Sequence, residues 1–308
     1  MRASTGQTNA KTAGGFFKKS MAGWLFTSPM TLGLLLFTFY PMVMSLVYAF
    51  SNFNGVEQFD FVGFRNFTDV FSDRDFYTVL KNTFLHAAIS VPLNLVLSYL
   101  LALLVNQRIK GIASFRVFYY LPVVIPGIVS GVLWKDIYNP EFGILNQMLQ
   151  NLGLPPGKFL EASGTAMASL IVLNLWTLGA SMALWLSALK NIPEALYESA
   201  KIDGITPVKR LFFITVPMST TMIFYNLITG IIGALQTNST LVIANSKGRG
   251  PDNSLYFYAV KIYHEAFDGT RFNYGYASAL AWILFLIIAL LTVTVFKTNK
   301  WVYYGEDG

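Results

Sequence analysis

Six long apolar segments dominate the chain, and shorter polar stretches separate them. Each segment is close to the roughly 20 residues that a helix needs to cross the hydrocarbon of a bilayer. We therefore predict an all-α membrane protein with six transmembrane helices, at about 24–50, 79–106, 117–137, 165–189, 217–241 and 276–296. These spans form one transmembrane domain over residues 21–304, and their even number places both termini on the same side of the membrane.

The segment before the first span is polar and carries three lysines but no acidic residue. We expect residues 1–20 to form a disordered cytosolic arm. A signal peptide has a similar basic start, but the apolar run from Trp24 to Phe50 is longer than a signal-peptide core of about 7–15 residues. This run is therefore assigned as the first span.

The predicted loops on the two sides of the membrane differ in charge. The side with the termini carries 13 of the 22 basic residues and only 5 of the 16 acidic ones, whereas acidic residues are in excess on the other side. Lysine and arginine concentrate in the cytosolic loops of membrane proteins. Both termini and the segment 190–216 are therefore expected in the cytosol.

The composition supports a place in the lipid bilayer. With 54% hydrophobic and 12% charged residues, the chain has more apolar side chains than a soluble domain can bury. The net charge of +6 is spread between the spans and forms no dense basic patch with interleaved aromatics, so no nucleic-acid partner is expected. The absence of cysteine excludes disulfides, thiolate nucleophiles and cysteine-based metal sites.

The spans carry few groups that could do chemistry. The chain has no P-loop of the form G-x4-G-K-[ST], so it should not bind ATP itself. The span interiors hold no carboxylate and no basic residue, which disfavours an ion-coupled secondary transporter. His86 in the second span could relay protons, but a hydrogen bond to a neighbouring helix is the simpler role. Because His264 is the only other histidine, we predict no catalytic residue and no metal site.

The segment 190–216 is the longest charged stretch between two spans. Asn191 can cap a short helix whose first turn contains Pro193 and Glu194, and Gly204 can end that helix. Thr206 and Pro207 are a typical start for a second short helix. The pattern predicts two short helices joined by a glycine turn, although a plain connecting loop would also show capping residues.

Five residues of this stretch have a specific spacing, E-x-A-x3-G-x9-I-x2-P, formed by Glu198, Ala200, Gly204, Ile214 and Pro217. This pattern resembles the EAA loop of ABC importer permeases. Further stretches resemble blocks of the carbohydrate subfamily: Tyr40-Pro41, residues 62–67, Lys81-Asn-Thr83, Tyr120-Leu-Pro122, Gly250-Pro-Asp252 and residues 272–279. The resemblance covers residues 20 to 304.

The resemblance implies a type I importer permease in a bacterial or archaeal cell membrane. Such a chain works with a second homologous permease, two ATPase subunits that bind ATP and magnesium, and an extracytoplasmic solute-binding protein. It would bind no cofactor and catalyse no reaction itself. Residues 190–216 would be the coupling loop, in which Glu198 and Asp203 face the ATPase, Gly204 permits the turn, and Leu196, Ala200, Ile202 and Ile205 give apolar contacts.

The resemblance also implies a sugar or oligosaccharide as the solute, with a glycerol phosphate ester as an alternative. Sugar sites combine aromatic faces with amides and hydroxyls. The fourth and fifth spans offer candidates for the substrate path, namely Asn174, Trp176, Thr177, Gly230, Gly233, Ala234, Gln236 and Thr237, with Tyr225, Asn226 and Asn238 nearby. In maltose-type relatives, polar site residues correspond to Gly230, Ala234 and Thr237, and two of these are small and apolar here. Close helix packing is an equally good explanation for the small residues.

Overall fold

The computed structural model describes residues 23–56, 60–107, 109–268 and 272–303. These residues form helices and loops, with one isolated antiparallel bridge between Ser51 and Phe61. The predicted arm over residues 1–20 lies outside them. The all-α prediction is confirmed.

Three of the predicted spans are single helices, which extend over Gly23–Ala49, α4 (Arg74–Val105) and α17 (Tyr274–Lys297). The first contains a π-helical turn, η1 (Leu35–Phe39), directly before α2 (Tyr40–Ala49). Pro41 follows this turn, and its missing N–H removes one backbone hydrogen bond at that point.

The other three spans are pairs of helices with a bend between them. The pair α5 (Ile112–Val124) and α6 (Gly127–Ile137) is bent by 101°, α8 (Ser163–Leu175) and α9 (Leu178–Lys190) by 47°, and Pro207–Met218 and α13 (Thr220–Leu235) by 66°. By length and composition, the described part of the chain therefore holds up to six membrane spans.

Shorter elements connect these helices. They are α3 (Arg65–Ser72), α7 (Ile144–Asn151), η2 (Phe159–Glu161), α10 (Glu194–Ile202), α14 (Thr240–Ile243), α15 (Asn245–Gly248), η4 (Pro251–Asn253), α16 (Tyr258–Phe267) and η5 (Asn299–Trp301). The helix Pro207–Met218 consists of α11 (Pro207–Arg210), a π-helical turn η3 (Leu211–Thr215) and α12 (Val216–Met218).

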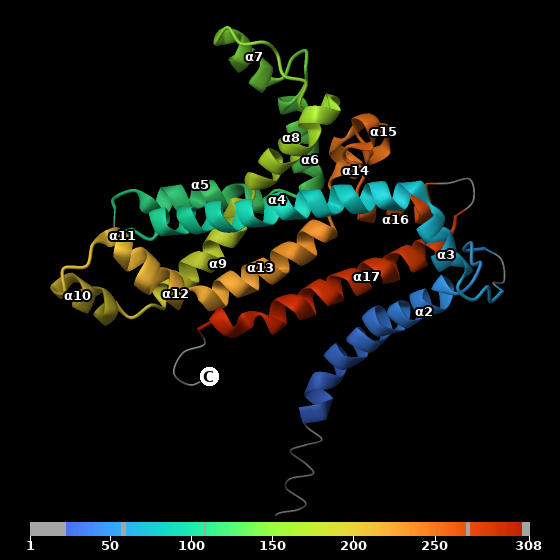
Figure 1. Cartoon of the computed structure of the whole chain (residues 1–308), viewed down its shortest axis with the longest axis horizontal. Helices are drawn as coiled ribbons and strands as arrows, with labels where there is room; N and C mark the ends of the chain where they lie inside the picture. The colour runs from blue at the N-terminus through green and yellow to red at the C-terminus, as the bar shows by residue number, and fades with distance from the viewer. Residues whose placement is uncertain (1–22, 57–59, 108, 269–271, 304–308) are drawn as a thin grey trace, which may run out of the picture.

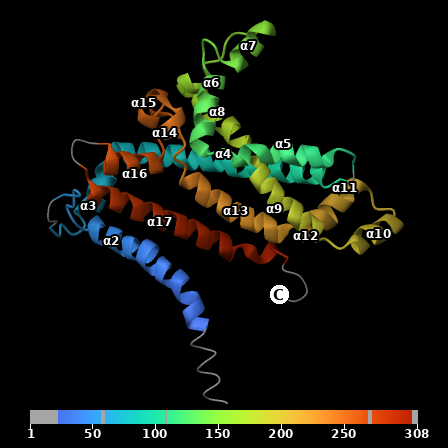
Figure 2. The ribbon, with the colours of Figure 1, turned by 180° about the vertical axis from the view of Figure 1, so that it is seen from behind.

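The long helices α4, α13 and α17 lie side by side along the long axis of the molecule (Figure 1). The helix α10 lies at one end of this bundle, whereas α3 and α16 lie at the opposite end. The segment α6–α7–α8 projects sideways, and α2 packs against α17 near α3 before it diverges from the bundle (Figure 2). The segment 190–216 and the loops that contain α3 and α16, predicted on opposite sides of the membrane, are thus at opposite ends of the fold.

The breaks follow from local chemistry. Pro126 lies between α5 and α6, whereas Pro122 remains inside α5. The break at Trp176–Thr177 was not predicted; there the Thr177 hydroxyl donates to the carbonyl of Asn174 (2.9 Å) and competes with the helical hydrogen bonds.

The prediction of 217–241 for the fifth span is wrong at both ends. Its helix begins at Pro207, breaks at Ser219 and ends at Leu235. The hydroxyls of Ser219 and Thr220 donate to backbone carbonyls at the break, to Thr215 (2.6 Å) and Pro217 (2.7 Å). The polar run Gln236–Ser239 then ends the helix, because such side chains favour turns over continued helix.

The stretch 242–275, predicted as a polar loop, contains some of the most buried side chains of the described chain. Leu255, Tyr256, Phe257 and Tyr258 are fully buried at the start of α16. The side chain of Asn82 on α4 donates to the carbonyls of Asn253 (2.8 Å) and Tyr256 (3.1 Å), which satisfies backbone groups that burial removes from water. This loop is therefore part of the hydrophobic core.

A buried lysine joins three helices at the same end of the molecule. Lys261 of α16 is 2% exposed, and its Nζ lies 2.6 Å from Asp73 Oδ2 at the start of α4 and 3.0 Å from Glu265 Oε1. The hydroxyl of Tyr276 on α17 donates to the same oxygen of Asp73 (2.9 Å). Because each charge has an opposite partner, the cluster can remain ionised although it is partly withdrawn from water.

The pKa shifts agree with a stable ion cluster. Burial by itself raises the pKa of Asp73, but hydrogen bonds from Lys261, the Asp75 amide and Tyr276 outweigh it, so the pKa lies below the usual 3.8. Burial lowers the pKa of Lys261, but Asp73 and Glu265 hold it above 10.5. The stability from Asp73 is lost only as pH falls through its depressed pKa, and that from Lys261 only as pH rises through its raised pKa.

We expect Lys261→Met to destabilise the protein by about 3 kcal/mol, because it leaves two carboxylates without their cation. Thermal unfolding of the purified protein at neutral pH measures this. Lys247→Met is the matched control, since Lys247 pairs with Asp268 (2.7 Å) while its own side chain is 70% exposed. Equal losses for the two variants would contradict a special role of the buried lysine.

The last described residues form a C-terminal strap (Asn299–Tyr303) that packs on the first turn of α13. The Thr221 hydroxyl donates to the carbonyl of Tyr303 (2.5 Å), and the Tyr303 amide donates to Thr220 Oγ1 (2.8 Å). Val302 is 8% exposed, and the ring of Trp301 meets Phe224 edge-on. The strap therefore holds α13 directly after the break at Ser219.

Candidate functional site

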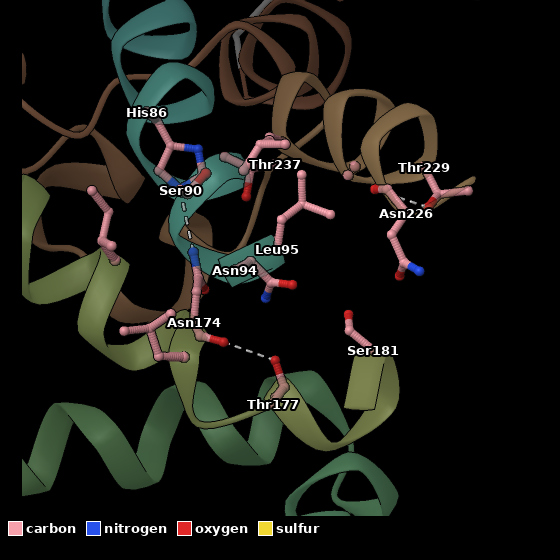
Figure 3. A pocket seen from close by; sticks show the side chains of 16 residues that line it. His86, Ser90, Asn94, Leu95, Asn174, Thr177, Ser181, Asn226, Thr229 and Thr237 are labelled. Carbon is pink, nitrogen blue, oxygen red and sulfur yellow. Dashed lines mark hydrogen bonds between the residues drawn. The ribbon is translucent and has the colours of Figure 1, made fainter. Parts of the chain in front are cut away.

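A cavity of about 380 Å³ lies between α4, the α8–α9 bend and α13 (Figure 3). Its polar lining consists of His86, Ser90 and Asn94 from α4, Asn174, Thr177 and Ser181 from the α8–α9 pair, and Asn226, Thr229 and Thr237 from α13 and its end. Among the described residues that line it, none is Asp, Glu, Lys or Arg. The cavity therefore offers hydroxyl, amide and imidazole groups but no formal charge when His86 is neutral.

Helical spacing explains why these side chains meet. His86, Ser90 and Asn94 are four residues apart and so share one face of α4. On α13, the spacing of Asn226, Gly230 and Gly233 has the same effect. Small residues matter there, because a Cβ on Gly230 would lie only 3.3 Å from Val91 Cγ1 of α4. Glycine thus permits the close approach of α13 and α4 beside the cavity.

The fourth span places three polar residues toward the cavity on either side of its bend. Asn174 lies in the last turn of α8, Thr177 lies in the break, and Ser181 follows in the first turn of α9. Figure 3 shows all three side chains on the side that faces α4 and α13. Their spacing of three and four residues places them on one face of the fourth span.

His86 is 2% exposed and connects two walls of the cavity. Its Nε2 lies 3.3 Å from the side-chain nitrogen of Asn174. Because an amide NH2 group can only donate, Nε2 is the acceptor and the ring is neutral with its proton on Nδ1. Nδ1 has no partner in hydrogen-bond geometry among the described residues, although the Ala234 carbonyl interacts with the ring. The expected hydrogen bond between His86 and a neighbouring helix is present.

Most of the residues proposed for the substrate path lie together. Asn174, Thr177, Gly230, Gly233, Ala234 and Thr237 line the cavity. Their role in transport remains a prediction.

Trp176 and Gln236 do not line the cavity, and their placement there is corrected. Trp176 packs edge-on against Trp134 at 5.7 Å between ring centroids. Gln236 lines a separate, mainly apolar pocket with Ala259, Ile262 and Leu284. Both residues directly precede or follow a cavity residue in sequence, and the helical rotation of about 100° per residue turns them away.

Four of the polar lining residues were not predicted from the sequence, namely Ser90, Asn94, Ser181 and Thr229. A signal was present in the four-residue spacing of Ser90 and Asn94 after His86. The expected aromatic faces are missing, since no Phe, Tyr or Trp is among the described residues that line the cavity. The described chain also holds no group of three or more His, Cys, Asp or Glu side chains that could bind a metal ion.

The segment 190–216 forms two helices joined by a glycine turn, as predicted. Gly204 has φ +71°, its amide donates to the Lys201 carbonyl (3.2 Å), and the Ile205 amide donates to the Ala200 carbonyl (2.9 Å). This pair of hydrogen bonds is a Schellman motif. Thr206 caps the helix that begins at Pro207. The prediction that Asn191 caps the first helix is wrong, because Asn191 ends α9 and Pro193 precedes the first residue of α10.

The surface of this segment combines acidic and apolar side chains. Glu198, Asp203, Gly204 and Pro217 are exposed, Ile214 is half-buried, and Ile202 is 86% exposed. Ala200 is only 3% exposed and packs inward, so the expectation that it gives an external apolar contact is wrong.

Two contacts hold the first short helix to the helix that follows. The Tyr197 hydroxyl lies 3.1 Å from Thr215 Oγ1, and the Arg210 guanidinium lies 5.8 Å from the centre of the Tyr197 ring. These contacts connect α10 to the Pro207–Met218 helix on the far side of the glycine turn. A displacement of α10 should therefore be transmitted to that helix.

Comparisons with known proteins agree with this architecture. The chain is 35% identical over 291 residues to the probable ABC transporter permease protein YesP of Bacillus subtilis, with 93% of each chain covered. It is 29% identical to the lactose transport system permease protein LacF of Rhizobium radiobacter, with 90% of this chain and 94% of that one covered.

Among solved structures, a chain of a bacterial alginate ABC transporter, in complex with an alginate pentasaccharide-bound periplasmic protein, matches with a TM-score of 0.82. It is 22% identical and the match covers 93% of this chain and 96% of that one, which shows a shared fold. The family model for the inner membrane component of binding-protein-dependent transport systems matches residues 94–302. The chain therefore belongs to the family of inner membrane components of binding-protein-dependent transport systems.

Proposed function

We propose that this chain is the permease subunit of an ABC importer that moves a sugar or oligosaccharide into the cytosol. The observation that carries the proposal is the cavity between α4, α8–α9 and α13, whose polar lining consists of uncharged hydrogen-bonding groups. Sugar hydroxyls both donate and accept hydrogen bonds, and amides and hydroxyls satisfy them without formal charge. The names of relatives support this solute class, since they include lactose, multiple-sugar and diacetylchitobiose permeases.

The cavity is less suited to the alternative solute, a glycerol phosphate ester. A phosphate group is usually bound by Arg or Lys side chains or by a helix N-terminus. None of the described lining residues is basic. An ion-coupled secondary transporter is also disfavoured, because the cavity offers no carboxylate to bind the coupling ion.

The loop 190–216 is proposed as the coupling element. Glu198, Asp203 and Gly204 lie on the exposed surface of α10 and its turn, where a cytosolic ATPase could dock. Ile214 and Pro217 lie on the helix that leads to the break at Ser219. Closure of the ATPase would push α10, and the contacts of Tyr197 would pass this movement to α12 and α13.

The remaining partners follow from this role. ATP and magnesium would be bound by two ATPase subunits, and this chain would catalyse no reaction. A second permease would complete the path through the bilayer and supply the aromatic faces that this cavity lacks. An extracytoplasmic binding protein would deliver the solute at the end where α3 and α16 lie.

We expect both termini and the loop 190–216 in the cytosol, because basic residues are in excess on that side. A reporter fused after Gly308 should then be active only in the cytosol, and one inserted near Gly250 only outside. The opposite result at both positions would reverse the orientation and remove the proposed coupling role.

We expect Thr177→Val to raise the sugar concentration for half-maximal uptake about tenfold, since it removes one hydrogen-bonding group from the cavity at nearly constant volume. Uptake into proteoliposomes that contain the complete assembly measures this. Gln236→Ala is the control outside the cavity and should leave the concentration unchanged. An equal change in both variants, or lower thermal stability without any change in sugar dependence, would argue for a packing role.

A further inference from the structure

The hydrogen bond between His86 and Asn174 determines which group of the Asn174 side-chain amide already has a partner within the protein. An asparagine side chain has a donating NH2 group and an accepting carbonyl oxygen. The NH2 group faces His86 Nε2 at 3.3 Å. The carbonyl oxygen is then the end of the amide that remains for a solute in the cavity.

The surroundings reinforce this orientation. His86 is 2% exposed, so water does not compete for its ring. A protonated imidazole has two donors and no acceptor, so it could not receive the Asn174 NH2 group. The neutral ring therefore holds the Asn174 NH2 group and leaves the side-chain carbonyl oxygen for the cavity.

An acceptor oxygen distinguishes between neutral and acidic sugars. A sugar hydroxyl can donate to it, whereas a carboxylate of a uronic acid has only acceptor atoms at neutral pH and is repelled. A carboxylate that leaves water needs a cation or several N–H donors in exchange. The described cavity lining holds no Lys or Arg, and the NH2 group of Asn174 is already occupied by His86.

We propose that this cavity selects uncharged, hydroxyl-rich saccharides over acidic ones, and that His86 is the positioning residue that sets this preference through Asn174. The proposal rests on the proposed function and narrows its substrate class.

The test is uptake of two oligosaccharides of equal length, a neutral oligogalactoside and an acidic oligogalacturonide, by proteoliposomes with the complete assembly. The same binding protein is present at the same saturating concentration for every variant, so a difference in preference between variants arises in the permease. The measured quantity is the ratio of neutral to acidic uptake.

Wild type should prefer the neutral sugar. His86→Leu removes the acceptor for the Asn174 NH2 group, frees the amide to turn, and should lower the ratio about tenfold. His86→Gln keeps an acceptor oxygen on a side chain of similar length and should retain most of the ratio. Gln236→Ala, outside the cavity, should leave it unchanged.

Ser90→Lys is a second, independent test of the cavity, which can be used if the His86→Leu protein does not assemble. Ser90 lies one turn after His86 on the cavity face of α4, so a lysine there introduces a cation and should shift the ratio toward the acidic sugar by tenfold or more. An unchanged ratio in the assembled cavity variants would overturn the inference. Failure of wild type to take up either sugar would instead contradict the proposed function.

Discussion

Gly179→Ala is expected to destabilise the protein by about 3 kcal/mol, although it adds a single methyl group. Gly179 is buried in the first turn of α9, where α9 packs against α5. A Cβ at this position would lie 2.7 Å from the carbonyl carbon of Tyr119 and 3.0 Å from Cα of Tyr120. Because these are backbone atoms, no side-chain rotation can make room, and α5 and α9 would have to separate.

Thermal unfolding of the purified protein, together with its yield after membrane extraction, measures this effect. Gly164→Ala is the matched control in α8, because a Cβ there has no described atom within 4 Å. It should be neutral or slightly stabilising, since alanine favours helix over glycine by about 0.5–1 kcal/mol. Equal behaviour of the two variants would show that α5 and α9 do not approach as closely as described.

Gly204→Val is expected to reduce sugar uptake and transport-linked ATP hydrolysis at least tenfold while the protein still inserts in the membrane. Gly204 has φ +71°, which costs a residue with a β-carbon roughly 1–2 kcal/mol and is especially unfavourable for a β-branched one. No described atom lies within 4 Å of a Cβ built there, so backbone strain is the cause. The turn that sets the angle of α10 would open, and docking to the ATPase would fail.

Gly204→Asn is the control that distinguishes backbone strain from the mere addition of a side chain. Asparagine tolerates the left-handed conformation better than other non-glycine residues. This variant should retain most of the uptake. The measurements are uptake and ATP hydrolysis by the complete assembly in proteoliposomes, with membrane insertion verified for each variant. Full uptake by a well-inserted Gly204→Val variant would exclude the proposed coupling role of this turn.

Long apolar runs predicted the helices well where no residue interrupts them. The sixth span was expected at 276–296 and extends over Tyr274–Lys297, because hydrophobicity alone determines where such a helix lies. The helix of the second span begins at Arg74, five residues before the predicted start of the span. Asp73 caps this helix, because the Asp73 carboxylate accepts a hydrogen bond from the Asp75 amide (2.8 Å). A cap among polar residues is invisible to a hydrophobicity criterion.

Tertiary contacts decided the features that could not be predicted. Tyr256 and Phe257 lie in a stretch between two predicted spans and are buried because the chain packs against α4, where Asn82 donates to the Tyr256 carbonyl and the His86 ring meets Phe257. In the cavity, residue type identified Asn174 and Thr177 but could not exclude Trp176, which packs against Trp134 instead. Ser90 and Asn94 of α4 were missed because serine and asparagine are common in apolar helices, although their four-residue spacing after His86 was a signal.

The C-terminal strap is synthesised after the helices whose joint it stabilises. Its residues Val302 and Tyr303 pack on Thr220 and Thr221, directly after the break at Ser219 through which the loop 190–216 would move α13. A nascent chain that has reached Lys297 contains the described membrane helices, but not yet the residues that secure this joint. The joint is therefore completed only after these helices have been synthesised, and a chain without Val302 and Tyr303 would contain all of them and yet lack a firm hinge.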